Sequence, residues 1–124
     1  MKFLRALLVV GVLVAGVYEL AEFTQNRPDL SYEGQVSELT LRVRTKDGYA
    51  PVVAVEGLWA QCRNTVQSRS LAGPIAEVAT GQFHLLVKPG LGRNGSRRLV
   101  GCLEDATTPG VSGQVIDGPR RRPA

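Results

Sequence analysis

Cys62 and Cys102 are the residues of this 124-residue chain best suited to covalent chemistry, and they are its only cysteines. In a reducing compartment they would be small buried hydrophobic residues. In an oxidising compartment, an even number of cysteines in so small a domain is typical of a disulfide. A bridge closes a loop of about 40 residues, for which the loop-entropy model gives roughly 3–4 kcal/mol. We predict a Cys62–Cys102 disulfide, on the condition that the domain is exported.

His84 is the single histidine, and a catalytic hypothesis would depend on it. It lies within the apolar run 83–87, where alternation places it on the exposed face of a strand. A nucleophile and an orienting acid would have to lie beside it, and no spacing singles out Ser96, Glu104 or Asp105 for these roles. Two cysteines and one histidine without short spacing do not make a zinc site. We therefore expect a noncatalytic domain without a metal or cofactor.

Residues 90–95 (GLGRNG) match the pattern G-x-G-x-x-G. A dinucleotide site requires a helix that opens at the third glycine and an acidic residue about 20 positions further on. The apolar run 99–103 instead predicts a strand after this motif. We therefore interpret Asn94-Gly95 as turn residues of a β-hairpin that joins 83–88 to 99–103.

The formal net charge of +4 arises mostly at the two ends of the chain. Residues 23–119 contain ten basic and nine acidic side chains, so the surplus lies in Lys2, Arg5 and the run 120–122. Because a nucleic-acid binder needs a basic face on its folded part, we exclude nucleic acid as a partner. The candidates for contact with an anionic surface are Arg93, Arg97, Arg98, Arg120, Arg121 and Arg122. For the last three, a disordered solubilising tail is the alternative.

The N-terminal segment 1–23 has the features of a signal anchor or a signal peptide. Lys2 and Arg5 precede an unbroken apolar run over 6–18, as in targeting segments. The longer stretch 3–20 has about 18 residues, which is the lower limit for a helix that crosses a bilayer. We therefore predict export and contact with the lipid bilayer through residues 3–20.

The orientation and the processing of this segment are separate questions. Because positive charge precedes the apolar run and glutamates follow it, we expect the N-terminus in the cytoplasm and the domain outside. The best cleavage candidate lies near Gly16, inside the apolar run, which is a poor position for one. We favour a retained single-pass anchor in the cell membrane, and a secreted, cleaved chain is the alternative.

After a linker over 24–33, the pattern predicts a β domain over 34–118 and a disordered basic tail over 119–124. Short apolar or alternating runs predict strands at 39–44, 52–55, 75–78, 83–87, 99–103 and 111–116. This spacing favours a small antiparallel β-sandwich after an N-terminal hydrophobic helix. Helical spacing of Trp59, Cys62 and Val66 leaves open an α+β fold with a short helix over 58–67.

The stretch 80–90 (TGQFHLLVKPG) resembles the G-x-F-x-x-x-V-x-P-G strand of prealbumin-like and carboxypeptidase-regulatory-like modules. The resemblance covers this strand alone and implies a prealbumin-like sandwich. An immunoglobulin-like sandwich is the other form considered, although Trp59 precedes Cys62 and the diagnostic order is absent. In either form, the bridge would join two sheets with Trp59 in the core beside it.

These features together predict a membrane-anchored extracytoplasmic accessory or binding domain of the cell envelope. We expect it to be noncatalytic and to bind another envelope protein. A secreted small-ligand carrier or inhibitor, released by signal cleavage, is the alternative. A small exported hydrolase that uses His84 is a remote one.

Overall fold

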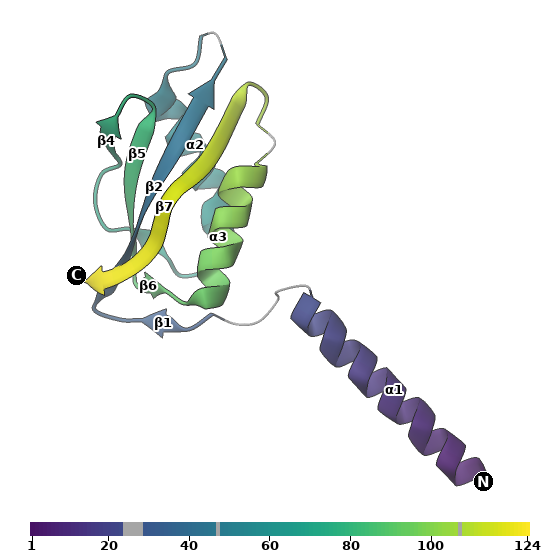
Figure 1. The fold of residues 1–124 in the computed structure, drawn as a ribbon. Coiled ribbons are helices and arrows are strands. Elements are labelled where there is room, and N and C mark those ends of the chain that lie inside the picture. The colour runs from purple at the N-terminus through teal and green to yellow at the C-terminus, as the bar shows by residue number, and fades with distance from the viewer. Residues whose placement is uncertain (24–28, 47, 107) are drawn as a thin grey trace.

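A long apolar helix precedes a domain built from both helices and strands (Figure 1). The computed structural model describes residues 1–23, 29–46, 48–106 and 108–124. Helix α1 covers Lys2–Phe23, and its segment Lys2–Leu20 has a mean hydropathy of 2.0 with none of it buried. The helix is therefore long and apolar enough to be a signal or transmembrane segment.

In the described part of the chain, five strands form one antiparallel sheet and two short strands form another. The strands of the main sheet are β2 (Gln35–Thr45), β3 (Ser70–Leu71), β4 (Ala76–Ala79), β5 (Gln82–Lys88) and β7 (Val111–Pro123). They lie in the order β3-β5-β2-β7, and β4 also pairs with β5. The short strands β1 (Ser31–Tyr32) and β6 (Gly90–Leu91) pair with each other at one end of the domain.

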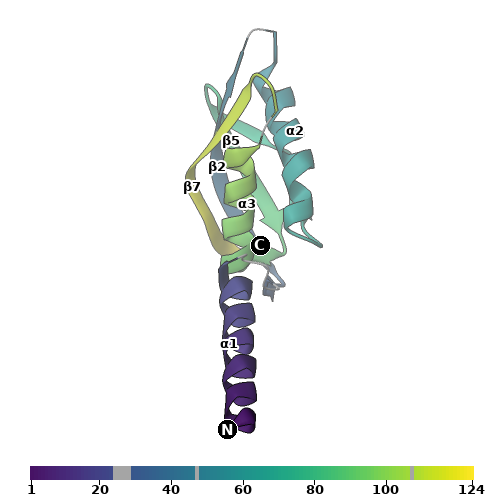
Figure 2. The same cartoon turned by 90° about the vertical axis from the view of Figure 1, so that its right-hand side faces the viewer.

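Two helices cover one face of the main sheet, as Figure 2 shows. Helix α2 (Pro51–Cys62) continues into a 3-10 turn, η1 (Arg63–Thr65), and helix α3 (Arg93–Asp105) follows β6. Along the chain, α2 joins β2 to the β4–β5 hairpin, and α3 leads to β7. With β7, β2, β5 and β4 side by side, this is the split βαβ arrangement.

The central strands β2 and β5 form because apolar and polar residues alternate along them. On β2, Leu39, Leu41 and Val43 are buried, and the residues between them face away from the helices. On β5, Phe83 and Leu85 are buried in the same way, and Leu39 lies opposite Leu85 in the antiparallel register. The predicted strands over 39–44 and 83–87 are therefore confirmed.

The predicted strand over 52–55 is wrong, because these residues open helix α2. Pro51 lies in the first turn of the helix, where its missing N–H costs nothing. The buried residues of α2 recur with helical spacing along its whole length: Ala54, Val55, Leu58, Trp59 and Cys62. Burial of this stripe against the sheet outweighs the preference of the two exposed valines for strands.

The predicted strand over 99–103 and its hairpin are also wrong, because these residues belong to helix α3. Gly95, Leu99 and Leu103, each four residues apart, form the buried side of that helix. Asn94-Gly95 lies in the first turn of α3 and not in a hairpin turn. Burial of this side of the helix therefore outweighs the preference of Asn94-Gly95 for a hairpin turn.

The C-terminal tail is likewise not disordered as predicted over 119–124, since β7 continues to Pro123. Its arginines pair along β2, with Arg120 opposite Glu38, Arg121 opposite Ser37 and Arg122 opposite Val36. The expected antiparallel β structure is present, but the sandwich is not, because helices take the place of a second sheet layer. The α+β alternative is closer, with its helix placed earlier than 58–67.

Candidate functional site

The disulfide joins the two helices of the domain. Cys62, at the end of α2, is bonded to Cys102 in α3, with their Cα atoms 5.6 Å apart. Cys62 has no exposed surface, Cys102 packs against the core, and Trp59 belongs to the same buried cluster. The predicted bridge and the core position of Trp59 are confirmed, but the bridge fixes helix to helix and not sheet to sheet.

A carboxylate from the beginning of the domain sits at the N-terminus of α3. The backbone N–H of Gly92, the N-cap residue, donates a hydrogen bond of 2.9 Å to Oδ2 of Asp29. A Cβ atom added to Gly92 or Gly95 would collide with this carboxylate, so both glycines are required by its approach. Since the N-terminus of a helix favours negative charge, Asp29 caps α3 electrostatically as well as by hydrogen bonding.

Arg69 also contacts the carboxylate of Asp29. Its Nη2 lies 3.3 Å from Oδ2 of Asp29 and donates a 3.0 Å hydrogen bond to the carbonyl oxygen of Leu30. The two side chains are only 6% and 10% exposed, so the ion pair is largely shielded from water. We call Asp29, Arg69, Gly92 and Gly95 the linker junction, because they fix the first described residues after α1 to the helical layer.

The linker junction changes the interpretation of the G-x-G-x-x-G stretch. The first two residues of the motif form the short strand β6, and its last three open helix α3, contrary to the predicted hairpin. However, the place at which the helix would meet a phosphate is filled by the carboxylate of Asp29. Gly92 and Gly95 therefore make room for the carboxylate of Asp29, which belongs to the chain itself, and not for a bound phosphate.

Replacing Gly95 by alanine is expected to lower the free energy of unfolding by about 2 kcal/mol, because its Cβ meets the Asp29 carboxylate and overpacks the junction. Chemical denaturation followed by circular dichroism measures the change. Gly101→Ala in the same helix is the matched control, since nothing lies within 4 Å of its added Cβ. The control is expected to gain up to about 1 kcal/mol from helix propensity, and equal losses in both variants would contradict this account.

Asp29→Ala is expected to destabilise the domain by about 3 kcal/mol, because it removes the helix cap and leaves Arg69 buried without its partner. The same denaturation experiment measures the loss. Asp117→Ala is the control, because its ion pair with Arg120 joins side chains that are more than half exposed and should change stability by less than about 1 kcal/mol. Relief of the Gly95→Ala defect in the Asp29→Ala background would show that the two residues collide.

In the folded domain, the basic and acidic side chains are distributed unevenly between its two ends. One end holds β1, β6, η1, the start of α3 and the last residues of β7, and we call it the basic end (Figure 1). Its nine basic residues are Arg63, Arg69, Lys88, Arg93, Arg97, Arg98, Arg120, Arg121 and Arg122, against the acidic Asp29, Glu33, Glu38 and Asp117. At the opposite end, the described charged residues are Arg42, Arg44, Lys46, Glu56, Glu77, Glu104 and Asp105. A chain that is nearly neutral between its ends thus folds into a strongly polarised domain.

The six arginines predicted to contact an anionic surface form two groups at the basic end, one at the start of α3 and one at the end of β7. Arg93 and Arg97 are exposed on the first two turns of α3, while Arg98 is half-buried beside them. Arg121 lies over the ring of Tyr32, with its guanidinium carbon 3.7 Å from the ring centroid. Arg122 is exposed, although its Nε lies 2.8 Å from Oε2 of Glu38. The two groups come from distant segments of the chain, and the sequence did not show that both lie at the same end of the domain.

A hollow of about 540 Å3 opens beside the end of β7. Val36, Leu86 and Pro89 contribute apolar surface to its lining, while Lys88 and Arg122 contribute cations. Ser68 and Ser70 add hydroxyl groups on the side of β3. Its size and mixed lining are suited to a small amphiphilic molecule.

His84 lies on the face of the sheet that the helices leave uncovered, and its side chain is 31% exposed. Its Nε2 is 3.7 Å from Oε2 of Glu38, the same oxygen that Arg122 contacts. The position facing away from the core agrees with the prediction from alternation. The neighbouring hydroxyl-bearing residue across the ladder is Thr40, opposite His84 in register.

Sequence reasoning missed Asp29 and Arg69. Asp29 lies in the predicted linker, and 63 positions separate it from Gly92, which donates to it. The one available signal was the pair of glycines at 92 and 95, which marks a close approach to the start of α3. That signal could not identify which group approaches.

Comparison with protein-family models, with curated proteins and with solved structures finds no match to this chain.

Proposed function

We propose that this chain is a membrane-anchored extracytoplasmic domain of the cell envelope that binds another envelope protein and does no chemistry itself. The observation that carries the proposal is an apolar helix, unburied over Lys2–Leu20, that precedes a disulfide-closed domain. A continuous apolar surface of this length needs lipid around it. A structural disulfide is typical of compartments outside the cytoplasm. In this proposal α1 is retained, with Lys2 and Arg5 on the cytoplasmic side.

The uncovered face of the main sheet is the surface that we propose for the protein partner. Its positions come from alternate residues of β2, β5 and β7, among them the half-buried Thr40 and Arg42 and the exposed Arg44 and Gln114. Among the described residues, no carboxylate forms an ion pair with Arg42 or Arg44. Two unneutralised arginines side by side on a polar face favour a partner with an acidic surface.

The experiment is purification of the tagged full chain from native membranes in mild detergent. We expect a companion protein in a near-equimolar ratio, and we expect Arg42→Glu with Arg44→Glu to reduce it at least about tenfold by charge repulsion. Arg93→Glu with Arg97→Glu, on helix α3, makes the same change in net charge and should leave the companion bound. Recovery of the wild-type chain alone, or equal losses in both double variants, would contradict the proposal.

The hollow beside β7 favours a second candidate, a secreted carrier of a small ligand. Its volume of about 540 Å3 lies within the range of small-molecule sites. This function requires cleavage of α1, for which the sequence near Gly16 is the best candidate. A chain found in the soluble extracytoplasmic fraction, with a mass that lacks the residues up to about Gly16, would favour the carrier. A membrane-bound chain that retains Met1 would exclude it.

A further inference from the structure

We propose that the basic end of the domain rests on anionic phospholipid headgroups at the membrane surface from which α1 emerges. This inference rests on the proposed retention of α1 as an anchor. It goes further because it assigns a lipid class, a contact surface and an orientation to the domain. Lys88, Arg93, Arg97, Arg121 and Arg122 are the residues that we expect to contact the phosphates.

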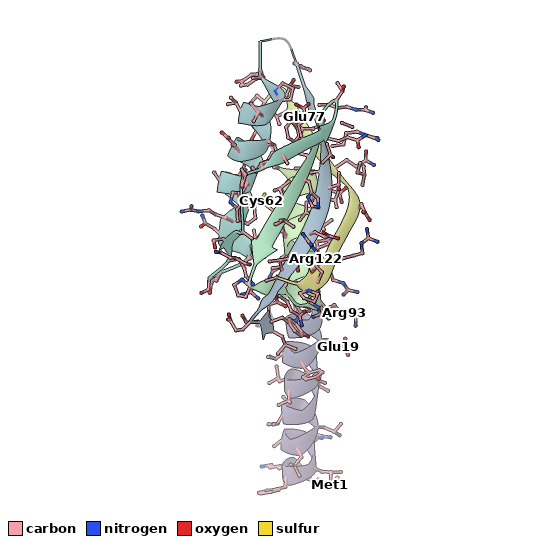
Figure 3. All side chains as sticks on the ribbon, turned by 90° about the vertical axis from the view of Figure 1, so that its left-hand side faces the viewer. Met1, Glu19, Cys62, Glu77, Arg93 and Arg122 are labelled. Carbon is pink, nitrogen blue, oxygen red and sulfur yellow. A yellow bond between two sulfur atoms is a disulfide. The ribbon has the colours of Figure 1, made fainter. Side chains whose placement is uncertain are left out.

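Chain length places the basic end beside the bilayer. Helix α1 ends at Phe23, and Asp29 is already fixed at the N-terminus of α3. The six peptide units between them span at most about 20 Å when fully extended. Because the linker junction lies at the basic end, that end cannot move far from the membrane surface. The opposite end, with Glu77 and the end of α3, points away from it (Figure 3).

Several cationic side chains at the basic end can bind lipid phosphates, because they lack an ion-pair partner among the described residues. Lys88, Arg93 and Arg97 are exposed, and the described residues provide no ion-pair partner for any of them. Arg121 packs one face of its guanidinium on Tyr32, which leaves its donors at the rim. Of the four acids at this end, Asp29 pairs with Arg69 and Asp117 with Arg120, while Glu33 accepts a hydrogen bond from Ser31. Glu38 pairs with Nε of Arg122, so Arg122 offers phosphate its two Nη groups but no unneutralised charge.

The size of the expected attraction is set by the number of cations near the surface. Each basic residue near an anionic leaflet strengthens association by about fivefold, and the effect decays within a Debye length of about 8 Å at physiological salt. Four cations without an ion-pair partner among the described residues (Lys88, Arg93, Arg97 and Arg121), held at one end by the linker, therefore suffice to orient the domain. A neutral leaflet offers no such attraction, so lipid charge is the variable to change.

The test uses the full chain in nanodiscs of phosphatidylcholine alone or with about one-third phosphatidylglycerol. An arginine-selective reagent such as phenylglyoxal modifies each guanidinium, and mass spectrometry measures the rate at each site. We expect phosphatidylglycerol to slow modification of Arg93, Arg97, Arg121 and Arg122 at least threefold, and high salt to reverse the effect. Arg42 and Arg44, at the opposite end, are internal controls whose rates should not change.

Two triple variants with the same change in net charge separate placement from total charge. Lys88→Gln, Arg93→Gln and Arg97→Gln together should abolish the lipid protection of Arg122. Arg42→Gln, Arg44→Gln and Lys46→Gln together should leave that protection intact. Equal rates in the two lipids, or equal effects of the two triples, would overturn the inference while leaving the anchor in place. Failure of the chain to enter nanodiscs would instead overturn the proposed anchoring, and this inference with it.

Discussion

Replacing both cysteines, Cys62→Ala with Cys102→Ala, is expected to lower the free energy of unfolding by about 4 kcal/mol. The bridge spans a sequence separation of 40 residues, and removing it restores the loop entropy of the unfolded chain. The native state loses contacts as well, because Cys62 is fully buried between α2 and α3. Since small domains are stable by only about 5–15 kcal/mol, the variant should be close to unfolding at physiological temperature.

Denaturant titration of the full chain in detergent micelles, followed by the circular dichroism of the domain, measures this loss. The wild-type chain under a strong reductant is the matched comparison, and it should be destabilised to a similar extent as the double variant. Adding the same reductant to the double variant should change nothing. A difference below about 1 kcal/mol between oxidised wild type and variant would show that the bridge has little part in stability.

Placing two arginines in α1, with Val9→Arg and Leu13→Arg, is expected to abolish membrane integration. Both positions lie in the apolar window Lys2–Leu20, and an arginine near the middle of a membrane helix costs about 2.5–3.5 kcal/mol. The two costs together reduce insertion by at least about a thousandfold. Without export the domain stays in a reducing compartment, so its cysteines should also remain free.

The measurement is alkaline extraction of membranes, with the chain quantified in pellet and supernatant. The control variant, Val9→Ile with Leu13→Ile, changes the same positions without adding charge and should remain in the pellet with the bridge formed. If the double arginine variant stays in the pellet with an intact bridge, α1 is not the element that brings the domain to an oxidising compartment.

The elements that could be predicted from the sequence are those whose residue pattern is compatible with only one kind of secondary structure. Strict alternation of Leu39, Leu41 and Val43 with polar residues allows only a half-buried strand. The apolar run 6–18 was similarly clear, since it has no polar face, which a helix at the surface of a globular core would need. The disulfide was predicted from cysteine count and inferred compartment, although its place between two helices was not.

The two domain helices were missed because local preferences and tertiary packing disagree there. Valines at 52, 53 and 55 favour strands locally, yet Val55 and Leu58 must face the sheet together, which only a helix allows. Asn94-Gly95 has the chemistry of a hairpin turn. It nevertheless opens a helix, because Asp29, far away in sequence, caps that end and fills the space beside the glycines.

The candidate sites depended even more on long-range contacts. Asp29 and Arg69 are 40 positions apart and acquire their role only when both reach α3. The arginines of β7 were expected in a free tail, whereas their pairing with β2 holds them in the sheet, at the same end of the domain as the start of α3. No local pattern in the sequence predicts that Asp29 meets Arg69, or that the arginines of β7 lie at the same end of the domain as the start of α3.

The state of the two sulfur atoms in fractionated cells tests the central claim most directly. Membranes and cytosol are separated, free thiols are alkylated without reduction, and the mass of the whole chain is measured in each fraction. If α1 carries the domain out of the cytoplasm and stays in the bilayer, the membrane fraction holds a chain that retains Met1 and carries no alkyl group. A cytosolic chain with both Cys62 and Cys102 alkylated would contradict the account.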